Sequence, residues 1–286
     1  MKVKINFSDF WEGFEKEDNP FFNLIKEDLD VQISEDPDFL FFSVFNKEVY
    51  SGGIKGEEHK KYKCKKIFYS GEPVPPDYND CDYSMSFDWI ESETHLRLPL
   101  YAIWGNSYYD LEDKKIEDKL WDRKFCNFVV SNPYCNFRND FFLKLNEYKK
   151  VDSGGRYLNN IGGNGISNKL EFQSEYKFSL AFENTEYLGY TTEKITNAMC
   201  AKSLPIYWGN SLVNKDFNTD SFINYHDFEN ENELIDYIIY LDNNKEEYLK
   251  KLKNPWIEGD KIKQEYSKEN IKKFLIQILK NNANIQ

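Results

Sequence analysis

Hydrophobic and polar positions in the first 120 residues follow two alternating periods. Residues 2–7 (KVKINF) alternate as in a strand, and residues 20–29 (PFFNLIKEDL) have helical spacing. Short apolar runs at 38–45, 65–70 and 82–87 predict buried strands. This part of the chain is therefore typical of an alternating β/α domain.

A second alternating pattern follows a polar run at residues 110–124, which predicts a linker or one solvated helix. The pattern predicts strands at 125–133, 177–182, 204–209 and 221–228, and helices at 139–148, 168–176, 192–203, 231–252 and 267–282. Alternating strands and helices imply parallel sheets, which bind ligands at the carboxyl ends of their strands. A length of 286 residues also favours two domains.

Composition narrows the class of protein. The apolar runs are shorter than the roughly 18 residues of a membrane span, and residues 1–10 have no signal-peptide core, so we expect a soluble, cytoplasmic protein. Five cysteines without a C-x-x-C pair predict neither a disulfide framework nor a zinc site. A net charge of -12 argues against a nucleic-acid partner, although a small anion could bind at a local cationic pocket.

Arginine is rare among the 37 basic residues. Only Arg97, Arg123, Arg138 and Arg156 carry a guanidinium. Because most basic residues are lysines, each arginine is a candidate for bidentate binding of a carboxylate or phosphate by its planar guanidinium. A surface arginine without a role fits each position equally well.

Residues 182–210 contain the most informative local pattern. Thr191 or Thr192 can cap a helix whose first turn holds Glu193 and Lys194. The free N–H groups of that turn, together with Lys194, suit a diphosphate, and Glu193 suits the hydroxyls of a ribose. An ordinary capped helix with a solvated lysine fits the same residues equally well.

The segment YKFSLAFENTEYLGYTTEKITNAMCAKSLPIYWGN and the following SFINYHDF resemble the signature of the α-1,3-fucosyltransferases, glycosyltransferase family 10. The resemblance continues through VVSNPYCNFRNDF, VDSGGRYLNNIG, FYSGEPVPPDYNDCDYSMSFD, RLPLY and DFWEGF, so it covers nearly the whole chain. The basic amphipathic tail and heptad repeats of some bacterial members are missing. The resemblance therefore does not imply membrane attachment of that kind, and a peripheral position at the inner face of the membrane stays open.

This resemblance implies a GT-B fold, with two facing Rossmann-like domains and a cleft between them. The expected division is 1–120 for the acceptor and the catalytic base, and 121–286 for GDP-fucose, with the last helix able to pack back on the first domain. The donor-site positions implied by the matching motifs are Arg138, Asn184, Tyr190, Thr192, Glu193 and Lys194. Further candidate contacts are Ser131, Asn132, Arg156, Trp11, His95 and Arg97. Trp11 fits core packing equally well.

Glu72 is the candidate catalytic base. It follows the predicted strand 65–70 and therefore lies at the carboxyl edge of the first sheet. The family inverts configuration by a single displacement, so one carboxylate must accept the proton of the acceptor hydroxyl. A glutamate in a G-E-P tripeptide is otherwise most often a turn residue, and the matching family block favours the catalytic role.

Three D-x-D patterns, at 28–30, 36–38 and 80–82, raise the question of a metal. Asp80 and Asp82 would share one face of a strand start, so geometry does not exclude an ion. Arg138, Lys194 and a helix N-terminus already supply positive charge, and the family resembled needs no bound metal. We therefore expect no required cofactor, with a divalent ion at most stimulatory.

The expected activity is transfer of L-fucose to a GlcNAc hydroxyl of an N-acetyllactosamine-type acceptor, as in Lewis-type glycan synthesis. Alternatives are an α-1,3/1,4-fucosyltransferase, a transferase for another nucleotide-sugar, and a non-catalytic nucleotide-sugar-binding protein. The last has no need of a base such as Glu72. The acceptor and the oligomeric state are not determined by the sequence.

Overall fold

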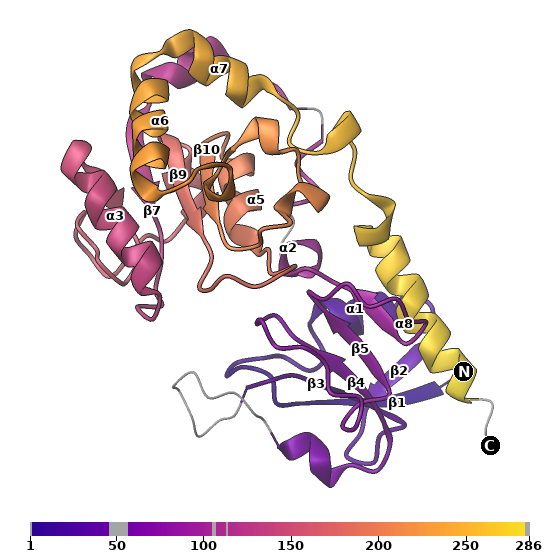
Figure 1. Cartoon of the computed structure of the whole chain (residues 1–286). Coiled ribbons are helices and arrows are strands. Elements are labelled where there is room, and N and C mark those ends of the chain that lie inside the picture. The colour runs from indigo at the N-terminus through magenta and orange to yellow at the C-terminus, as the bar shows by residue number, and fades with distance from the viewer. Residues whose placement is uncertain (1, 46–56, 105–106, 113, 284–286) are drawn as a thin grey trace. The chain divides into compact units, whose positions relative to one another are not determined.

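The computed structural model describes residues 2–45, 57–104, 107–112 and 114–283 (Figure 1). The chain forms two compact units, one of Met1–Trp104 with Lys263–Gln286 and the other of Gly105–Ile262. The sequence placed the boundary at residue 120, whereas the observed units divide after Trp104. The last helix joins the first unit, a packing that the sequence left open. Asp113 of the predicted linker lies outside the described residues.

The first unit contains a six-stranded parallel sheet in the order β2-β1-β3-β4-β5-β6. Its strands are β1 (Lys2–Ser8), β2 (Asp30–Ile33), β3 (Phe39–Phe42), β4 (Lys65–Tyr69), β5 (Tyr83–Ser86) and β6 (His95–Arg97). Its helices are α1 (Pro20–Lys26), α2 (Leu100–Ile103) and α8 (Lys268–Ala283). The short strands β2 and β6 were not predicted, because too few residues are present to show a period.

Helix α8 belongs to the first unit because its apolar stripe is buried there. Ile271, Leu275 and Leu279 are inaccessible to solvent. The helix contacts α1, beside which it runs in Figure 1. On the rim of this contact Lys272 Nζ lies 3.0 Å from a carboxylate oxygen of Glu27.

The second unit contains a five-stranded parallel sheet in the order β11-β10-β9-β7-β8. Its strands are β7 (Lys124–Phe128), β8 (Val151–Ser153), β9 (Tyr176–Phe182), β10 (Leu204–Trp208) and β11 (Ile223–Asn224). Its helices are α3 (Asn136–Tyr148), α4 (Lys169–Gln173), α5 (Glu193–Cys200), α6 (Glu231–Asn243) and α7 (Lys245–Lys253). Every residue of β9 is buried, as expected for a central parallel strand.

Three predicted elements of this unit are shorter or divided. The predicted helix 231–252 is two helices, because Asn244 ends α6 and its side chain accepts the Glu247 N–H to cap α7. The predicted helix 168–176 ends at Gln173, since Tyr176 already pairs with β7. The predicted strand 221–228 pairs with β10 only at Ile223 and Asn224.

The order of strands in this sheet reverses between β7 and β9. From β7 the chain goes outward to β8 on one side, and then returns to β9, β10 and β11 on the other. Figure 1 shows α3 and α5 on opposite sides of these strands. Ligands of such sheets bind beyond the carboxyl ends of the strands at the point of reversal, which here is the edge formed by Phe128 and Phe182.

Candidate functional site

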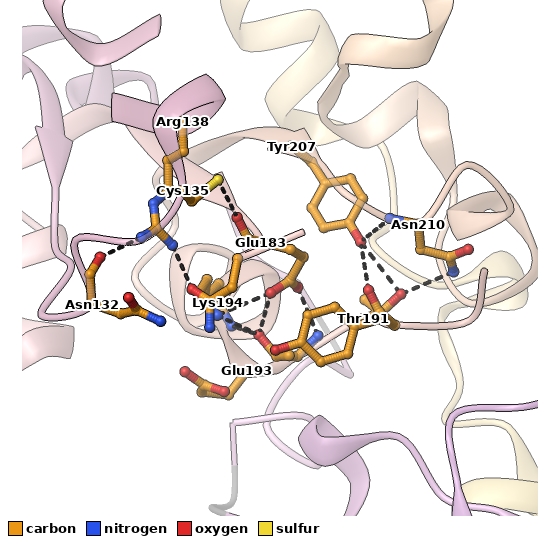
Figure 2. Close-up of polar contacts among 12 residues, drawn as sticks. Asn132, Cys135, Arg138, Glu183, Thr191, Glu193, Lys194, Tyr207 and Asn210 are labelled. Atoms are coloured by element: carbon orange, nitrogen blue, oxygen red, sulfur yellow. Dashed lines mark hydrogen bonds and ion pairs between the residues drawn. The ribbon is translucent and has the colours of Figure 1, made fainter. Parts of the chain in front are cut away.

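Arg138 lies at this edge of the second sheet, in the first turn of α3. Its side chain is almost fully buried, with 1% of its surface exposed. Nη1 donates to Asn184 Oδ1 at 2.6 Å, and Nη2 donates to the Asn132 carbonyl at 2.6 Å (Figure 2). The guanidinium thus joins the loop after β7 to the end of β9. Its Nε is buried and has no hydrogen-bond partner among the described residues.

Helix α5 begins at the same edge, and Thr192 is its N-cap residue. The Thr192 hydroxyl accepts from the Lys194 N–H at 3.4 Å and from Lys194 Nζ at 3.1 Å. Lys194 Nζ also lies 2.9 Å from Glu183 Oε2, and its side chain keeps 16% of its surface exposed. The ammonium is therefore held by Glu183 and Thr192 (Figure 2).

Glu193 points away from this buried pair. Its Oε1 lies 3.9 Å from Lys169 Nζ at the start of α4, and both side chains are about one-third exposed. The carboxylate can therefore contact a ligand while a second lysine stays close. Lys169 joins Lys194 and Arg138 as a third cationic side chain at this edge of the sheet.

Tyr190 and Thr191 lie deeper, beneath the first turn of α5. Thr191 Oγ1 accepts from Asn210 Nδ2 at 3.0 Å, and Asn210 Oδ1 accepts the Gly189 N–H at 2.8 Å. Tyr207 Oη accepts the Asn210 N–H at 3.0 Å and donates toward the Tyr190 carbonyl at 3.4 Å. These bonds tie the loop between β9 and α5 to the end of β10.

The electrostatics of the site favour the charged forms of Lys194 and Glu193. Burial alone would lower the pKa of Lys194, but Glu183 and Glu193 raise it above its ordinary value. Burial alone would raise the pKa of Glu193, but Lys194 and Lys169 lower it. Burial lowers the pKa of Arg138 and of Lys169. Three cationic groups face two carboxylates here, which suits a further anion.

Glu72 lies in the first unit, in the loop that follows β4. Its backbone is held by Ser70, whose Oγ accepts the Glu72 N–H at 3.1 Å and donates to the Glu72 carbonyl at 2.7 Å. Gly71 before it packs closely, since a Cβ there would lie 2.9 Å from Leu100 Cδ1. The predicted position at the carboxyl end of a strand is thus observed, and the side chain is half-buried.

The six further candidates lie in different surroundings. Ser131, Asn132 and Arg156 are exposed in loops after β7 and β8. In the first unit Trp11 packs against Phe14 and Trp104.

His95 and Arg97 lie on β6 and are engaged within the first unit. Both His95 ring nitrogens are in hydrogen bonds, with Ser84 Oγ and the Asp88 carbonyl. Arg97 stacks on Trp89 at 4.0 Å and donates to Tyr266 Oη. These contacts hold the loop after β5 within the first unit.

The D-x-D residues that we considered for metal binding have separate partners. Asp82 Oδ1 lies 2.6 Å from Lys65 Nζ, whereas Asp80 Oδ2 lies 3.8 Å from His59 Nε2. Asp38 Oδ2 accepts the Lys4 N–H at 2.9 Å. Within the described ranges, no group of three or more His, Cys, Asp or Glu side chains is arranged to hold a metal ion.

Glu183 and Lys169 were missed by sequence reasoning as members of the site. Glu183 directly follows a predicted strand, but its fully buried position beside Lys194 depends on the neighbouring strand. Lys169 lies 24 positions before Glu193, so no local spacing connects them. The rarity of arginine, in contrast, did point to Arg138.

Comparison with known proteins agrees with the fold. Residues 5–104 match the family model of the alpha-(1,3)-fucosyltransferase FucT N-terminal domain, and residues 120–280 match that of the glycosyltransferase family 10 (fucosyltransferase) C-terminal part. Alpha-(1,3)-fucosyltransferase FucT of Helicobacter pylori is 39% identical over 227 residues, which cover 67% of this chain and 47% of that protein. The chain thus spans about half the length of this curated relative.

Solved structures extend the likeness to nearly the whole fold. A crystal structure of alpha1,3-fucosyltransferase superposes with a TM-score of 0.81 at 31% identity, covering 98% of this chain and 90% of that one. A crystal structure of alpha1,3-fucosyltransferase with GDP-fucose gives 0.79 at 30% identity, covering 98% and 91%. The two parallel-sheet units are those of a GT-B glycosyltransferase. The chain belongs to glycosyltransferase family 10, the fucosyltransferases.

No helix among the described residues is long and apolar enough to cross a membrane.

Proposed function

We propose that this chain is an α-1,3-fucosyltransferase that moves L-fucose from GDP-β-L-fucose to a GlcNAc hydroxyl of an N-acetyllactosamine-type acceptor, with inversion. The observation that carries the proposal is a set of three cationic side chains at the edge of the second sheet where the order of the strands reverses. Arg138, Lys194 and Lys169 gather there beside the first turn of α5. Similarity to a fucosyltransferase crystallised with GDP-fucose supports the choice of nucleotide-sugar.

The proposed donor contacts follow from chemistry at this edge. Lys194 and the N–H groups of the first turn of α5 would bind the diphosphate, and Arg138 would contribute its charge from beneath. Glu193 would accept hydrogen bonds from the ribose hydroxyls. Positive charge at the diphosphate favours the reaction, because the leaving GDP gains negative charge in the transition state.

The proposed reaction is a single displacement. An acceptor hydroxyl oxygen forms a bond to the anomeric carbon of fucose while the bond from that carbon to the GDP oxygen breaks. Glu72 would accept the proton of the hydroxyl. Its backbone is held by Ser70, and the Val74 N–H donates to the Glu72 carbonyl at 2.7 Å. A fixed backbone suits a base that must keep its position.

The test is a binding panel followed by a turnover assay. Thermal shift with GDP, UDP, CMP and ADP should show stabilisation by GDP above the others. Turnover of GDP-fucose should then be measured on a glycan array and on the Galβ1-4GlcNAc and Galβ1-3GlcNAc disaccharides, with the product linkage and anomer determined by NMR. We expect transfer to O3 of the GlcNAc unit in Galβ1-4GlcNAc. Strong binding without turnover would favour a non-catalytic binding protein, and preference for UDP would favour another nucleotide-sugar.

The same assay tests our proposal that no metal is required. Because side chains supply the positive charge at the diphosphate, we expect most of the activity to persist in EDTA, with at most modest stimulation by Mn²⁺ or Mg²⁺. Complete loss in EDTA that Mn²⁺ restores would make Asp80 and Asp82 candidates for ligands again.

The geometry of Arg138 gives a further prediction. Its two terminal nitrogens bind Asn184 and the Asn132 carbonyl at the same time, and the single nitrogen of a lysine cannot reproduce the spacing of this planar fork. Arg138→Lys should therefore lower kcat/KM by about tenfold or more, although the charge is kept. Arg123→Lys is the matched control, since Arg123 Nη1 binds the Ala201 and Lys202 carbonyls at the far end of α5. Wild-type kinetics in Arg138→Lys would show that only the charge matters.

A further inference from the structure

Glu183 is the most deeply buried charged side chain of the site, with none of its surface exposed. It directly follows β9, and its carboxylate accepts three hydrogen bonds. Oε1 accepts the Thr192 N–H at 2.8 Å, and Oε2 accepts from Thr192 Oγ1 at 2.8 Å and from Lys194 Nζ at 2.9 Å (Figure 2). One carboxylate therefore holds the backbone of the α5 N-cap residue, its hydroxyl and the lysine of the first turn.

The end of the next strand leaves space for this carboxylate. Gly209 follows β10 with a φ of +148°, and a Cβ there would lie 2.5 Å from Glu183 Cγ and 2.7 Å from Glu183 Cβ. The Glu183 N–H donates to the Trp208 carbonyl at 2.9 Å, which fixes the two strand ends together. A side chain at position 209 would therefore force Glu183 or the end of β10 to shift.

We propose that Glu183 is a positioning residue for the diphosphate of the donor, which orients the Lys194 ammonium and the first turn of α5 before the nucleotide binds. The inference rests on the proposed function, because it assigns the diphosphate to this lysine. Glu183 itself is covered by Thr192 and Lys194, so it acts through them. In the empty protein it also gives the buried part of Lys194 a counter-charge, so that the lysine is not an unpaired cation.

Glu183→Gln tests this proposal. The amide cannot accept through both of its ends, so it keeps fewer of the three hydrogen bonds and loses the negative charge. We expect kcat/KM to fall about 10- to 100-fold, by analogy with the outer-shell groups that orient metal ligands. Glu183 raises the pKa of Lys194, so the variant should lose the charged lysine at a lower pH. The alkaline limb of its pH–activity profile should therefore move to lower pH.

Asp242→Asn is the matched control. Asp242 is also buried and also binds lysine, with Lys149 Nζ at 2.9 Å and Lys177 in a second ion pair, but it lies at the end of α6. This variant should lose stability and keep the wild-type alkaline limb. Glu183→Asp keeps the negative charge on a shorter side chain. Its alkaline limb should therefore lie close to that of the wild type, while its turnover should stay low. A wild-type profile in Glu183→Gln, or an equal shift in Asp242→Asn, would overturn the proposal.

A measurement on the wild-type chain needs neither turnover nor a folded Glu183 variant. In ¹⁵N NMR of the lysine ammonium groups, with Lys194→Arg for assignment, the Lys194 signal should be visible without nucleotide because its protons exchange slowly. Lys250, which is largely exposed, provides the reference for fast exchange. Exchange of Lys194 as fast as that of Lys250 would contradict the role of Glu183. If the Lys194 ammonium exchanges slowly but the protein does not transfer fucose, the proposed function is contradicted and the orientation of Lys194 by Glu183 is not.

Discussion

Replacing Glu72 with glutamine is expected to lower the turnover of fucose transfer by about 10²- to 10⁴-fold, the usual range for a positioned general base. Glutamine keeps the size and the hydrogen-bonding shape of the side chain but cannot accept the proton of the acceptor hydroxyl. GDP affinity should stay near the wild-type value, because Glu72 belongs to the first unit and the nucleotide candidates belong to the second. Calorimetry should therefore show wild-type affinity for GDP, whereas the transfer assay with N-acetyllactosamine should show a large loss of turnover.

The controls for this variant are Glu91→Gln and Glu93→Gln, two exposed glutamates in the loop after β5. Both should transfer fucose at close to the wild-type rate. Slow hydrolysis of GDP-fucose by water could partly survive in Glu72→Gln, since it depends less on deprotonating a sugar hydroxyl. If Glu72→Gln fucosylates normally, the base lies elsewhere and these two residues are the next candidates. Loss of GDP binding in Glu72→Gln would contradict the division of roles between the units.

Replacing Lys194 with alanine is expected to weaken binding of GDP-fucose and to lower kcat by about 10²- to 10³-fold, the typical effect of removing a donor that faces developing charge. The lost group is an ammonium at the start of α5 whose position Glu183 fixes, on a side chain that is 16% exposed. Steady-state kinetics with GDP-fucose and calorimetry with GDP would measure the two effects separately. Kinetics within a factor of about two of wild type would contradict the assignment.

Stability must be measured with the Lys194 variant, because the substitution leaves a buried carboxylate without its ion pair. Glu183 would keep two bonds from Thr192, so we expect a loss of up to about 3 kcal/mol. The double variant Glu183→Gln with Lys194→Ala should recover part of this stability and none of the activity. Lys250 is an exposed lysine on α7, so Lys250→Ala is the control. This variant should change neither stability nor activity.

The sequence by itself determined the features that depend on neighbours along the chain. Apolar runs predicted β1, β4, β9 and β10, and their alternation with helices predicted parallel sheets, as observed. Thr192 was one of two predicted caps of the helix that begins at Glu193, because a cap and its N–H partner are only two positions apart. The motifs also led to the family, which the comparisons confirm.

Only the tertiary structure decided which distant residues meet. Pairing of β7 with β9 brings Arg138 to Asn184 across 46 positions, and the Gly209 turn after β10 admits Glu183 beneath Lys194. The place of α8 likewise follows from the surface against which it packs. A periodic pattern shows that a helix has an apolar face but does not name the partner of that face. The sequence therefore assigned α8 to the second domain and left open that it packs back on the first, whereas burial against α1 places it in the first unit.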